Sequence, residues 1–492
     1  VSSGCVQGIE GKIILLEVQI YNLINKFTIV GLADTAIQEA KERVQFAIIN
    51  SGYKFGKKAI AINLAPAQMK KEGSQLDLAI AVGILLASKQ ITLPHLDKTI
   101  FLGELGLEGD VRPVPGTIAI LLHAKRLGFV RAYIPHGNQF EASLVGDQIE
   151  VFCLKNLKDL QTSNTHRLAS TAPHTSSIAH SASVDFSQIL GNVHAKRALI
   201  IAACGGHNVL LTGPPGTGKS LLAKAFSGIL PPLNQSELLT ITTIQSISGE
   251  LLNNETPQLY RPFRAPHHSA SANAIIGGGI IPRPGAITLA HLGVLFLDEF
   301  PEFHHDVLES LREPLEEGSI TIARTRGSFT FPANFQLIAA MNPCPCGFSG
   351  DKEIVCKCSL VLKERYLKKL SGPILDRIDL FSFVPRMKKE QLWHNSKETS
   401  SAEWKVSIEK AYQIQIARQG VTNAKLKITL ANALEQLNMD EEAKSIITNI
   451  TLLSARGLVR LLKVSRTIAD LAGHKKIMAP HIHEAINFRS MF

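Results

Sequence analysis

The chain has 492 residues, of which 45% are hydrophobic and 19% charged, a length that predicts about three domains. No apolar run approaches the ~20 residues that cross a bilayer, and the N-terminus lacks the basic start and apolar stretch of a signal peptide. We therefore expect a cytoplasmic protein with no membrane partner. The net charge of +10 favours an anionic partner, most often nucleic acid, although a surplus of solvated lysines would give the same balance.

The order of apolar and polar residues predicts an α/β protein with three parts. Within residues 1–160, apolar spacing predicts strands at 12–21 and 59–64, helices at 35–50 and 76–88, and a hairpin at 101–113 with its turn at 108–110. Residues 161–184 are rich in Ser, Thr, Ala and His with almost no large apolar side chain, which predicts a flexible linker. A second α/β domain is expected at 185–386 and a helical domain at 387–492.

A phosphate-binding loop is predicted between a strand at 208–212 and a helix at 221–230. The sequence there is GPPGTGKS, in which glycines let backbone N–H groups surround phosphate oxygens while the helix adds the positive end of its dipole. Lys219 is expected to contact the β- and γ-phosphates of ATP, and Ser220 to bind Mg²⁺. The predicted ATP-binding residues are Gly213, Pro214, Pro215, Gly216, Thr217, Gly218, Lys219 and Ser220.

Two later strands are expected to complete this site. Residues 294–297 predict a buried parallel strand that ends at Asp298 and Glu299. Asp298 is expected to hold Mg²⁺, directly or through water, and Glu299 to orient or deprotonate the attacking water. The strand at 336–341 ends at Asn342, whose amide is expected to hold that water near the γ-phosphate; a strand-end asparagine that makes a turn is the alternative.

At these residues the chain resembles a known family. The stretches GPPGTGKS (213–220), RPFRAPHHSASANAIIGGG (261–279), GVLFLDEF (293–300), AAMNPCPCG (339–347) and SARGLVRLLKVSRTIADLAG (454–473) are similar to those of magnesium-chelatase-like AAA+ ATPases, and within that group to the ComM/YifB competence proteins. The resemblance covers nearly the whole chain. It implies a P-loop AAA+ core followed by a helical lid.

The resemblance also implies an assembly and an activity. It implies a homo-hexameric ring with ATP at subunit interfaces, Asn342 as sensor 1, Arg377 as an arginine finger that reaches a neighbour's site, and Arg456 as the sensor-2 arginine. For Arg377 the alternative is an ion pair with Asp376 or Asp379. The family's activity implies a DNA helicase that drives branch migration of single-stranded DNA during natural transformation, with recombination proteins as further partners.

Two segments are candidates for contact with DNA. Residues 318–331 alternate like a β-hairpin at the position of the family's pre-sensor-1 hairpin, so Arg324 and Arg326 are expected to bind phosphates without reading sequence. The insertion at 261–284, with its three consecutive glycines, predicts a mobile loop that presents Arg264, His267 and His268. The alternatives are a solvated hairpin tip and a packing insertion.

Four of the seven cysteines form a cluster with the pattern C-P-C-x₉-C-K-C. Four thiols within so short a segment fit a structural, tetrahedral zinc site, with four unligated thiols as the alternative. The predicted ligands are Cys344, Cys346, Cys356 and Cys358.

The N-terminal domain resembles the Lon protease domain, but its catalytic dyad is missing. Gln75 stands at the expected nucleophile position, Ser74 is one residue away, and residues 112–118 contain no lysine to act as the base. We therefore expect no peptidase activity. A chelatase-type motor that acts on a protein partner and an ATP-dependent protease remain the alternatives to a DNA motor, and the second is disfavoured by the missing dyad.

Overall fold

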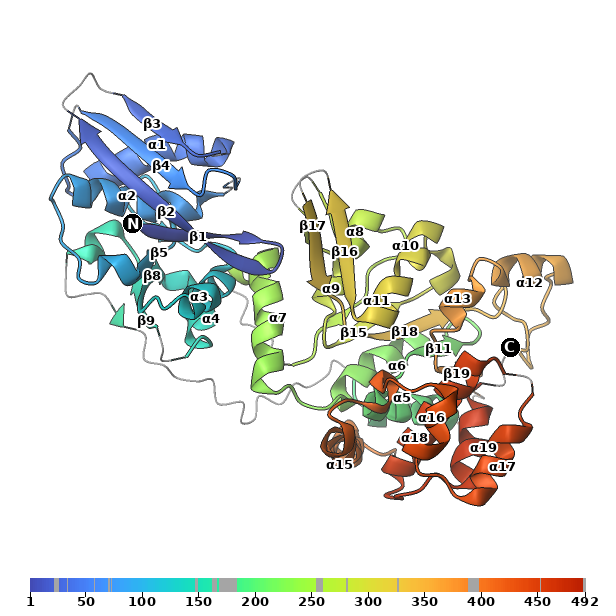
Figure 1. Cartoon of the computed structure of the whole chain (residues 1–492). Coiled ribbons are helices and arrows are strands. Elements are labelled where there is room, and N and C mark those ends of the chain that lie inside the picture. Colours follow the sequence, from blue (N-terminus) through green and yellow to red (C-terminus); the bar gives the residue numbers. More distant parts are fainter. Residues whose placement is uncertain are drawn as a thin grey trace. The chain divides into compact units, whose positions relative to one another are not determined.

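The computed structural model describes residues 1–21, 26–32, 34–56, 58–69, 71, 73–146, 149–161, 166–167, 184–253, 260–279, 282–324, 327–387, 398–451 and 453–489. They form two compact units (Figure 1). The first comprises Val1–Ile178, Gln235–Leu259 and Pro282–Pro284, and the second Ala179–Asn234, Tyr260–Ile281 and Gly285–Phe492. None of the helices in the described ranges combines the length and apolar character that a membrane span requires.

An eight-stranded mixed sheet organises the first unit, in the order β10-β9-β8-β5-β1-β2-β4-β3. The strands are β1 (Ser2–Gln7), β2 (Glu10–Tyr21), β3 (Phe27–Val30), β4 (Ala59–Ala65), β5 (Thr99–Phe101), β8 (Arg131–Pro135), β9 (Glu150–Leu154) and β10 (His166–Arg167). Apolar residues of α1 (Thr35–Asn50) and α2 (Asp77–Ala87) build one core with this sheet, and those of α3 (Thr117–Arg126) and α4 (Gln139–Ser143) build another.

The strands and helices expected in this region are confirmed, with two corrections. The hairpin is shorter than 101–113: Phe101 belongs to β5, which pairs with β1 and β8, and only β6 (Glu104–Leu105) and β7 (Val111–Arg112) pair across the turn. Within the expected linker, His166–Arg167 pairs with β9, while 162–165 and 168–183 lie outside the described residues. β1 was not predicted, because its Ser- and Gly-containing sequence lacks an apolar alternation.

Helix α7 (Gln235–Ser248) belongs to the first unit, although it follows the phosphate-binding loop in sequence. The backbone N–H of Gly116 donates to the carbonyl oxygen of Ser246 at 3.1 Å and to its Oγ at 2.9 Å. The expected domain at 185–386 is therefore interrupted: the chain leaves the second unit after Asn234 and re-enters it at Tyr260.

The second unit contains a five-stranded parallel sheet in the order β12-β15-β18-β11-β19. Its strands are β11 (Val209–Thr212), β12 (Phe263–Arg264), β15 (Val294–Leu297), β18 (Gln336–Met341) and β19 (Leu380–Phe383). The register pairs Thr212 with Met341 and Leu297 with Ala339, so the carboxyl ends of β11, β15 and β18 meet at one edge. Helices α5 (Val193–Gly205) and α6 (Lys219–Phe226) pack into the same core as these strands.

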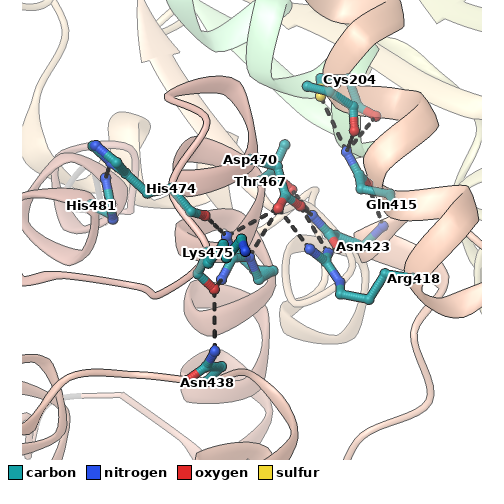
Figure 2. Close-up of polar contacts among 12 residues, drawn as sticks. Cys204, Gln415, Arg418, Asn423, Asn438, Thr467, Asp470, His474, Lys475 and His481 are labelled. Carbon is teal, nitrogen blue, oxygen red and sulfur yellow. Dashed lines mark hydrogen bonds and ion pairs between the residues drawn. The ribbon is translucent and has the colours of Figure 1, made fainter.

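The C-terminal region is helical, as expected. It contains α15 (Ser401–Gln419), α16 (Leu430–Gln436), α17 (Glu441–Asn449), α18 (Ala455–Leu471) and α19 (Ala479–Asn487). A buried polar network ties α15 and α18 together: the Asp470 carboxylate accepts from Arg418 Nη1 at 2.7 Å and from Asn423 Nδ2 at 2.9 Å (Figure 2). Gln415 of α15 donates to the carbonyl oxygen of Cys204 in α5 at 3.2 Å, which attaches these helices to the sheet-bearing part of the unit.

Candidate nucleotide site

The phosphate-binding loop joins β11 to α6, and its glycines have two different reasons to be there. Gly216 (φ +74°) and Gly218 (φ +87°) lie in the left-handed region with open space where a Cβ would be, so they are required for backbone conformation. At Gly213 a Cβ would lie 2.2 Å from the carbonyl oxygen of Val384, so this glycine is required for space. This conformation and space would let the loop expose backbone N–H groups to a phosphate.

Lys219 begins α6 and is buried, with its ammonium group turned into the loop. Nζ donates to the carbonyl oxygens of Gly213 at 2.7 Å and Pro214 at 2.8 Å, and to Asn342 Oδ1 at 3.3 Å. Burial lowers the pKa of Lys219 to about 8, against an opposing effect of the Asp298 carboxylate. An anionic phosphate beside this ammonium would favour its charged form.

The predicted magnesium ligands lie in direct contact. Ser220 Oγ donates to Asp298 Oδ2 at 2.6 Å, which brings the end of β15 to the first turn of α6. A hydroxyl and a carboxylate oxygen are hard ligands of the kind that Mg²⁺ takes together with nucleotide phosphates. The residues present therefore fit a bound Mg·ATP, with Asn342, the residue directly after the neighbouring strand β18, facing the same Lys219.

Glu299 follows β15 in a strained backbone conformation. Its φ of +53° lies in the left-handed region, which is uncommon for a residue with a side chain and is found at functional sites. Its N–H donates to Asp298 Oδ1 at 2.9 Å, and its Oε2 lies 2.8 Å from His268 Nδ1. The sequence analysis did not predict this contact between His268 and Glu299. The signal for it was weak: His268 follows the short strand β12, which pairs with β15.

The insertion that contains His268 is structured, which corrects the expected mobile loop. Its described residues include β12, α8 (Ala272–Ile276), β13 (Gly277–Gly278) and β14 (Arg283–Pro284), and β12 pairs in parallel with β15. Arg264 Nε donates to the carbonyl oxygen of Leu289 at 3.4 Å, and His267 Nδ1 lies 2.8 Å from Ser269 Oγ. Contact of Arg264, His267 and His268 with DNA stays a prediction.

The two predicted arginines of the subunit interface line one cavity of about 1050 Å³. Arg377 enters it after α13 (Gly372–Leu375), and Arg456 enters it from the first turn of α18. Among the described residues that line this cavity, none belongs to the phosphate-binding loop 213–220. Within one chain, the arginines and the loop thus lie at different places.

Arg377 does not pair with Asp376 or Asp379, the alternatives that its sequence neighbours offered. Its guanidinium contacts Glu316 and donates to the carbonyl oxygens of Pro373 at 2.7 Å and Arg312 at 3.2 Å. Only 12% of the side chain is exposed in the single chain. To reach another subunit's nucleotide, Arg377 would have to leave Glu316.

The backbone beside Arg377 is fixed by a buried carboxylate. Asp379 Oδ1 accepts from Arg460 Nη1 of α18 at 2.7 Å, and Asp379 Oδ2 accepts from the N–H of Asn208 at 3.1 Å. Burial alone would raise the pKa of Asp379, but Arg460 and His207 outweigh it and hold the pKa well below its usual range. Asn208 Nδ2 also donates to the carbonyl oxygen of Arg377 at 2.9 Å, so the start of β11 holds the arginine loop.

The hairpin expected at 318–331 is present as β16 (Ser319–Arg324) and β17 (Gly327–Pro332). Ile320 and Ile322 of β16 are buried, and the register pairs Arg324 with Gly327. The backbone of Arg324 is described but its side chain is not, and Arg326 lies outside the described residues. Their contact with DNA stays a prediction.

The four clustered cysteines converge after Asn342. Their sulfur atoms all lie within 4.8 Å of one another, and Cys344 Sγ lies 3.4 Å from Cys346 Sγ and 3.7 Å from Cys356 Sγ. Backbone N–H groups of Phe348 and Lys357 hold the pKa of the Cys346 thiol below its usual range. The cluster is compatible with a zinc site.

Ser74 and Lys71 of the first unit make their polar contacts with other groups. Ser74 Oγ contacts Glu104, and the buried Lys71 donates through Nζ to the carbonyl oxygens of Gly31, at 2.9 Å, and Pro66. The lack of peptidase activity stays a prediction.

Relatives of known name match the chain over nearly its whole length. It is 42% identical over 500 residues to competence protein ComM of Haemophilus influenzae, covering 100% of this chain and 97% of that protein. It is 43% identical over 491 residues to the protein YifB of Salmonella typhimurium, covering 98% and 95%. The magnesium-chelatase 38 kDa subunit of Rhodobacter capsulatus is 26% identical over 179 residues, 32% of this chain and 50% of that subunit.

Three family models match successive parts of the chain. They are described as subunit ChlI of Mg-chelatase (residues 16–138), magnesium chelatase, subunit ChlI (185–392) and magnesium chelatase, subunit ChlI C-terminal (398–489). The resemblance drawn from the sequence motifs is thereby confirmed. The chain belongs to the ComM/YifB family of magnesium-chelatase-like AAA+ proteins.

Proposed function

We propose that the chain is an ATP hydrolase that forms a homo-hexameric ring and moves single-stranded and branched DNA. The observation that carries the ATPase proposal is the cluster of Lys219, Ser220, Asp298 and Asn342 at one edge of the parallel sheet. Similarity to a relative named competence protein ComM supports DNA as the substrate, as does the net charge of +10. In this proposal the motor promotes integration of incoming DNA by recombination during natural transformation, in the cytoplasm and alongside recombination proteins.

Each residue of the edge receives a role in the proposal. Lys219 and the loop bind the phosphates, and Ser220 and Asp298 hold Mg²⁺, which would neutralise the charge that develops on the transferred phosphoryl group. Glu299 takes the proton of the attacking water, and Asn342 orients that water. His268 holds the Glu299 carboxylate at 2.8 Å and thereby sets its direction before nucleotide arrives.

A ring is proposed because one chain does not bring its arginines to its own loop. Arg377 and Arg456 share a cavity that no residue of 213–220 lines, so these two always-charged guanidinium groups would reach the γ-phosphate bound by a neighbouring copy. A head-to-tail contact of this kind closes into a ring when its rotation fits. The helices after Ser400 would then act as the lid that presents Arg456.

The DNA contacts are proposed for the β16–β17 hairpin first. Arg324 and Arg326 are at the end of this hairpin in sequence and would bind phosphates in the pore without reading bases. Arg264, His267 and His268 form the second proposed group. A structural Zn²⁺ on the four clustered cysteines and a Lon-like, proteolytically inactive N-terminal domain complete the proposal.

A chelatase-type motor that remodels a protein partner is the second candidate. The observation that favours it is the match of magnesium chelatase subunit models to three parts of the chain. The two candidates differ in whether DNA changes ATP turnover.

The experiment uses purified chain, ATP, Mg²⁺ and labelled forked and three-stranded DNA. If the chain is a DNA motor, these DNA substrates should stimulate its ATP hydrolysis, and the chain should displace strands. A Glu299→Gln chain should show neither effect. A chain with Arg324→Ala and Arg326→Ala is expected to keep its ATPase without DNA and to lose the stimulation. ATP turnover that ignores DNA, with no strand movement, would contradict the DNA proposal and favour a protein partner.

A further inference from the structure

The cysteine cluster has the dimensions of a four-thiolate metal site. Cys344, Cys346 and Cys356 have sulfur–sulfur distances of 3.4, 3.6 and 3.7 Å, and Cys358 lies within the same 4.8 Å group. A tetrahedral zinc ion with Zn–S bonds of about 2.3 Å would set its sulfurs about 3.8 Å apart. Disulfide bonds would need about 2.05 Å, and all four cysteines are free.

This cluster touches both halves of the nucleotide site. Cys344 lies two residues after Asn342, and the N–H of Gly347 closes a turn onto the carbonyl oxygen of Cys344 at 2.9 Å. At Gly347, where φ is +85°, a Cβ would lie 2.7 Å from Pro215 Cδ in the phosphate-binding loop and 3.8 Å from Asn342 Cγ. The turn that Gly347 closes after Cys344 and Cys346 therefore packs between Asn342 and the phosphate-binding loop.

We infer that Cys344, Cys346, Cys356 and Cys358 bind one Zn²⁺ that holds Asn342 against the phosphate-binding loop, so that zinc occupancy sets the rate of ATP hydrolysis. The inference rests on the proposed ATPase function. The role follows from the spacing: Asn342 directly follows strand β18, and the cysteine segment begins two residues after it. A side chain that orients water tolerates displacement of only about half an ångström.

In this inference zinc positions Asn342 and does not touch the nucleotide. Its loss should therefore change turnover more than nucleotide binding. Zinc removal shifts Asn342, which acts on the attacking water, while Lys219, Ser220 and the backbone of the loop still bind phosphate. We expect about a ten-fold lower kcat with a nearly unchanged nucleotide dissociation constant, in the range found when the groups that orient a reactive site are disturbed.

The test compares four full-length variants with the original chain in zinc content, nucleotide affinity and kcat without DNA. Cys358→Ser should lose zinc and kcat, and Cys358→His, which still offers a zinc ligand, should recover much of both. Cys153→Ala, a buried cysteine of β9 outside the cluster, is the matched control and should change neither. Gly347→Ala should keep zinc but lower kcat several-fold, because its Cβ pushes on Pro215.

Each outcome separates the inference from the proposed function. A chain purified without zinc, or a zinc-free Cys358→Ser chain with unchanged kcat, would overturn the zinc inference and leave the ATPase proposal standing. A zinc-loaded chain that hydrolyses no ATP would overturn the coupling together with the proposed ATPase. Thermal unfolding of each variant is followed in parallel, and loss of zinc and kcat in a chain that retains its nucleotide affinity supports the inference.

Discussion

In the proposed function, two regions of the second unit divide the chemistry of ATP hydrolysis between them. One is the sheet edge, where Lys219, Ser220, Asp298 and Asn342 contact one another directly. The other is the arginine cavity, lined by Arg377 and Arg456 together with Glu316 and Lys425. In this proposal the first region supplies the phosphate loop and the magnesium ligands, and the second supplies cations that would stabilise charge on a transferred phosphoryl group.

The two regions differ in how much of each the single chain fixes by itself. The sheet edge is assembled by strand register, which the chain fixes by itself. In the arginine cavity, Arg377 is held by Glu316, an exposed carboxylate that a neighbour's nucleotide would replace. Only the Glu316 side of this ion pair is exposed, and a bound phosphate would compete with Glu316 for the Arg377 guanidinium.

The largest expected effect comes from changing the sheet edge. Glu299→Gln should lower kcat by about 10³-fold while ATP still binds, because the amide accepts no proton from the attacking water. Single-turnover hydrolysis and nucleotide binding check this. The matched control is Glu302→Gln, three residues on and paired with Lys369 at 2.8 Å, which should leave kcat nearly unchanged.

Arg377→Ala removes one group that would stabilise charge on the phosphoryl group, and should lower kcat by about 100-fold. If the comparison is right, nucleotide affinity of the dilute, unassembled chain stays the same, because Arg377 does not face its own loop. Isothermal titration at low protein concentration measures it. Arg386→Ala removes an arginine paired with Asp351 at 3.3 Å and is the control; a comparable loss of turnover in that variant would count against a specific role for Arg377.

A smaller effect is expected from the buried carboxylate behind the arginine loop. Asp379→Asn leaves Arg460 without its charged partner and should destabilise the second unit by about 3 kcal/mol. Trp404 packs against the core of this unit, so urea unfolding followed by tryptophan fluorescence reports on it. Asp376→Asn, an exposed neighbour in the same cavity, should change stability little.

Low pH should also destabilise the second unit, as Asp379→Asn does. The folded pKa of Asp379 is held below its ordinary value, so its contribution to stability is present above pH ~4 and is lost as the pH falls. An Asp379→Asn chain lacks that loss. Equal acid sensitivity of the two chains would show that Asp379 is not charged in the folded protein.

The smallest expected effect concerns Glu141, a buried carboxylate of the first unit. Its pKa is shifted upward, whereas that of Asp379 is shifted downward. Burial raises the pKa of Glu141 to about 7, although Ser246 of α7, Asn138 and the N–H of Ile118 donate hydrogen bonds to it. A raised folded pKa gives stability that is present below about pH 4.5 and lost as the pH rises through 7. Hydrogen exchange of α3 and α7, corrected for intrinsic rates, should therefore quicken from pH 6 to 8.

A glutamine at position 141 is the sharpest control for that pH dependence. Glu141→Gln keeps an acceptor but has no proton to lose, so its exchange should be nearly independent of pH over the same range. Glu108→Gln, at an exposed turn, should behave like the original chain. An unchanged pH dependence in Glu141→Gln would assign it to another group.

Much of the nucleotide site was predictable from sequence because its parts follow local patterns. The loop 213–220 requires its glycines, and buried apolar strands end at Asp298 and Asn342. Since parallel strands align their carboxyl ends, the residues after them meet at one edge. The cysteine cluster was predictable for the same reason, because its four thiols are close in sequence.

Contacts between distant segments left no such pattern. His268 was expected to contact DNA, yet it lies beside Glu299 because β12 pairs with β15 over a separation that spacing does not reveal. Helix α7 has an ordinary helical sequence, and tertiary contacts such as the bonds from Gly116 to Ser246 are what show that it joins the first unit. Arg377 was expected to pair with a sequence neighbour if it paired at all, and it pairs with Glu316 instead.

The central claim, that a complete site takes its loop from one chain and its arginines from the next, is tested most directly by mixing two inactive chains. Lys219→Ala has no working loop but keeps Arg377, and Arg377→Ala has the reverse. If the claim holds, mixed rings should regain up to about a quarter of the original turnover, since one interface in four pairs a working loop with a working arginine. Mixtures that stay as inactive as their components would contradict the claim.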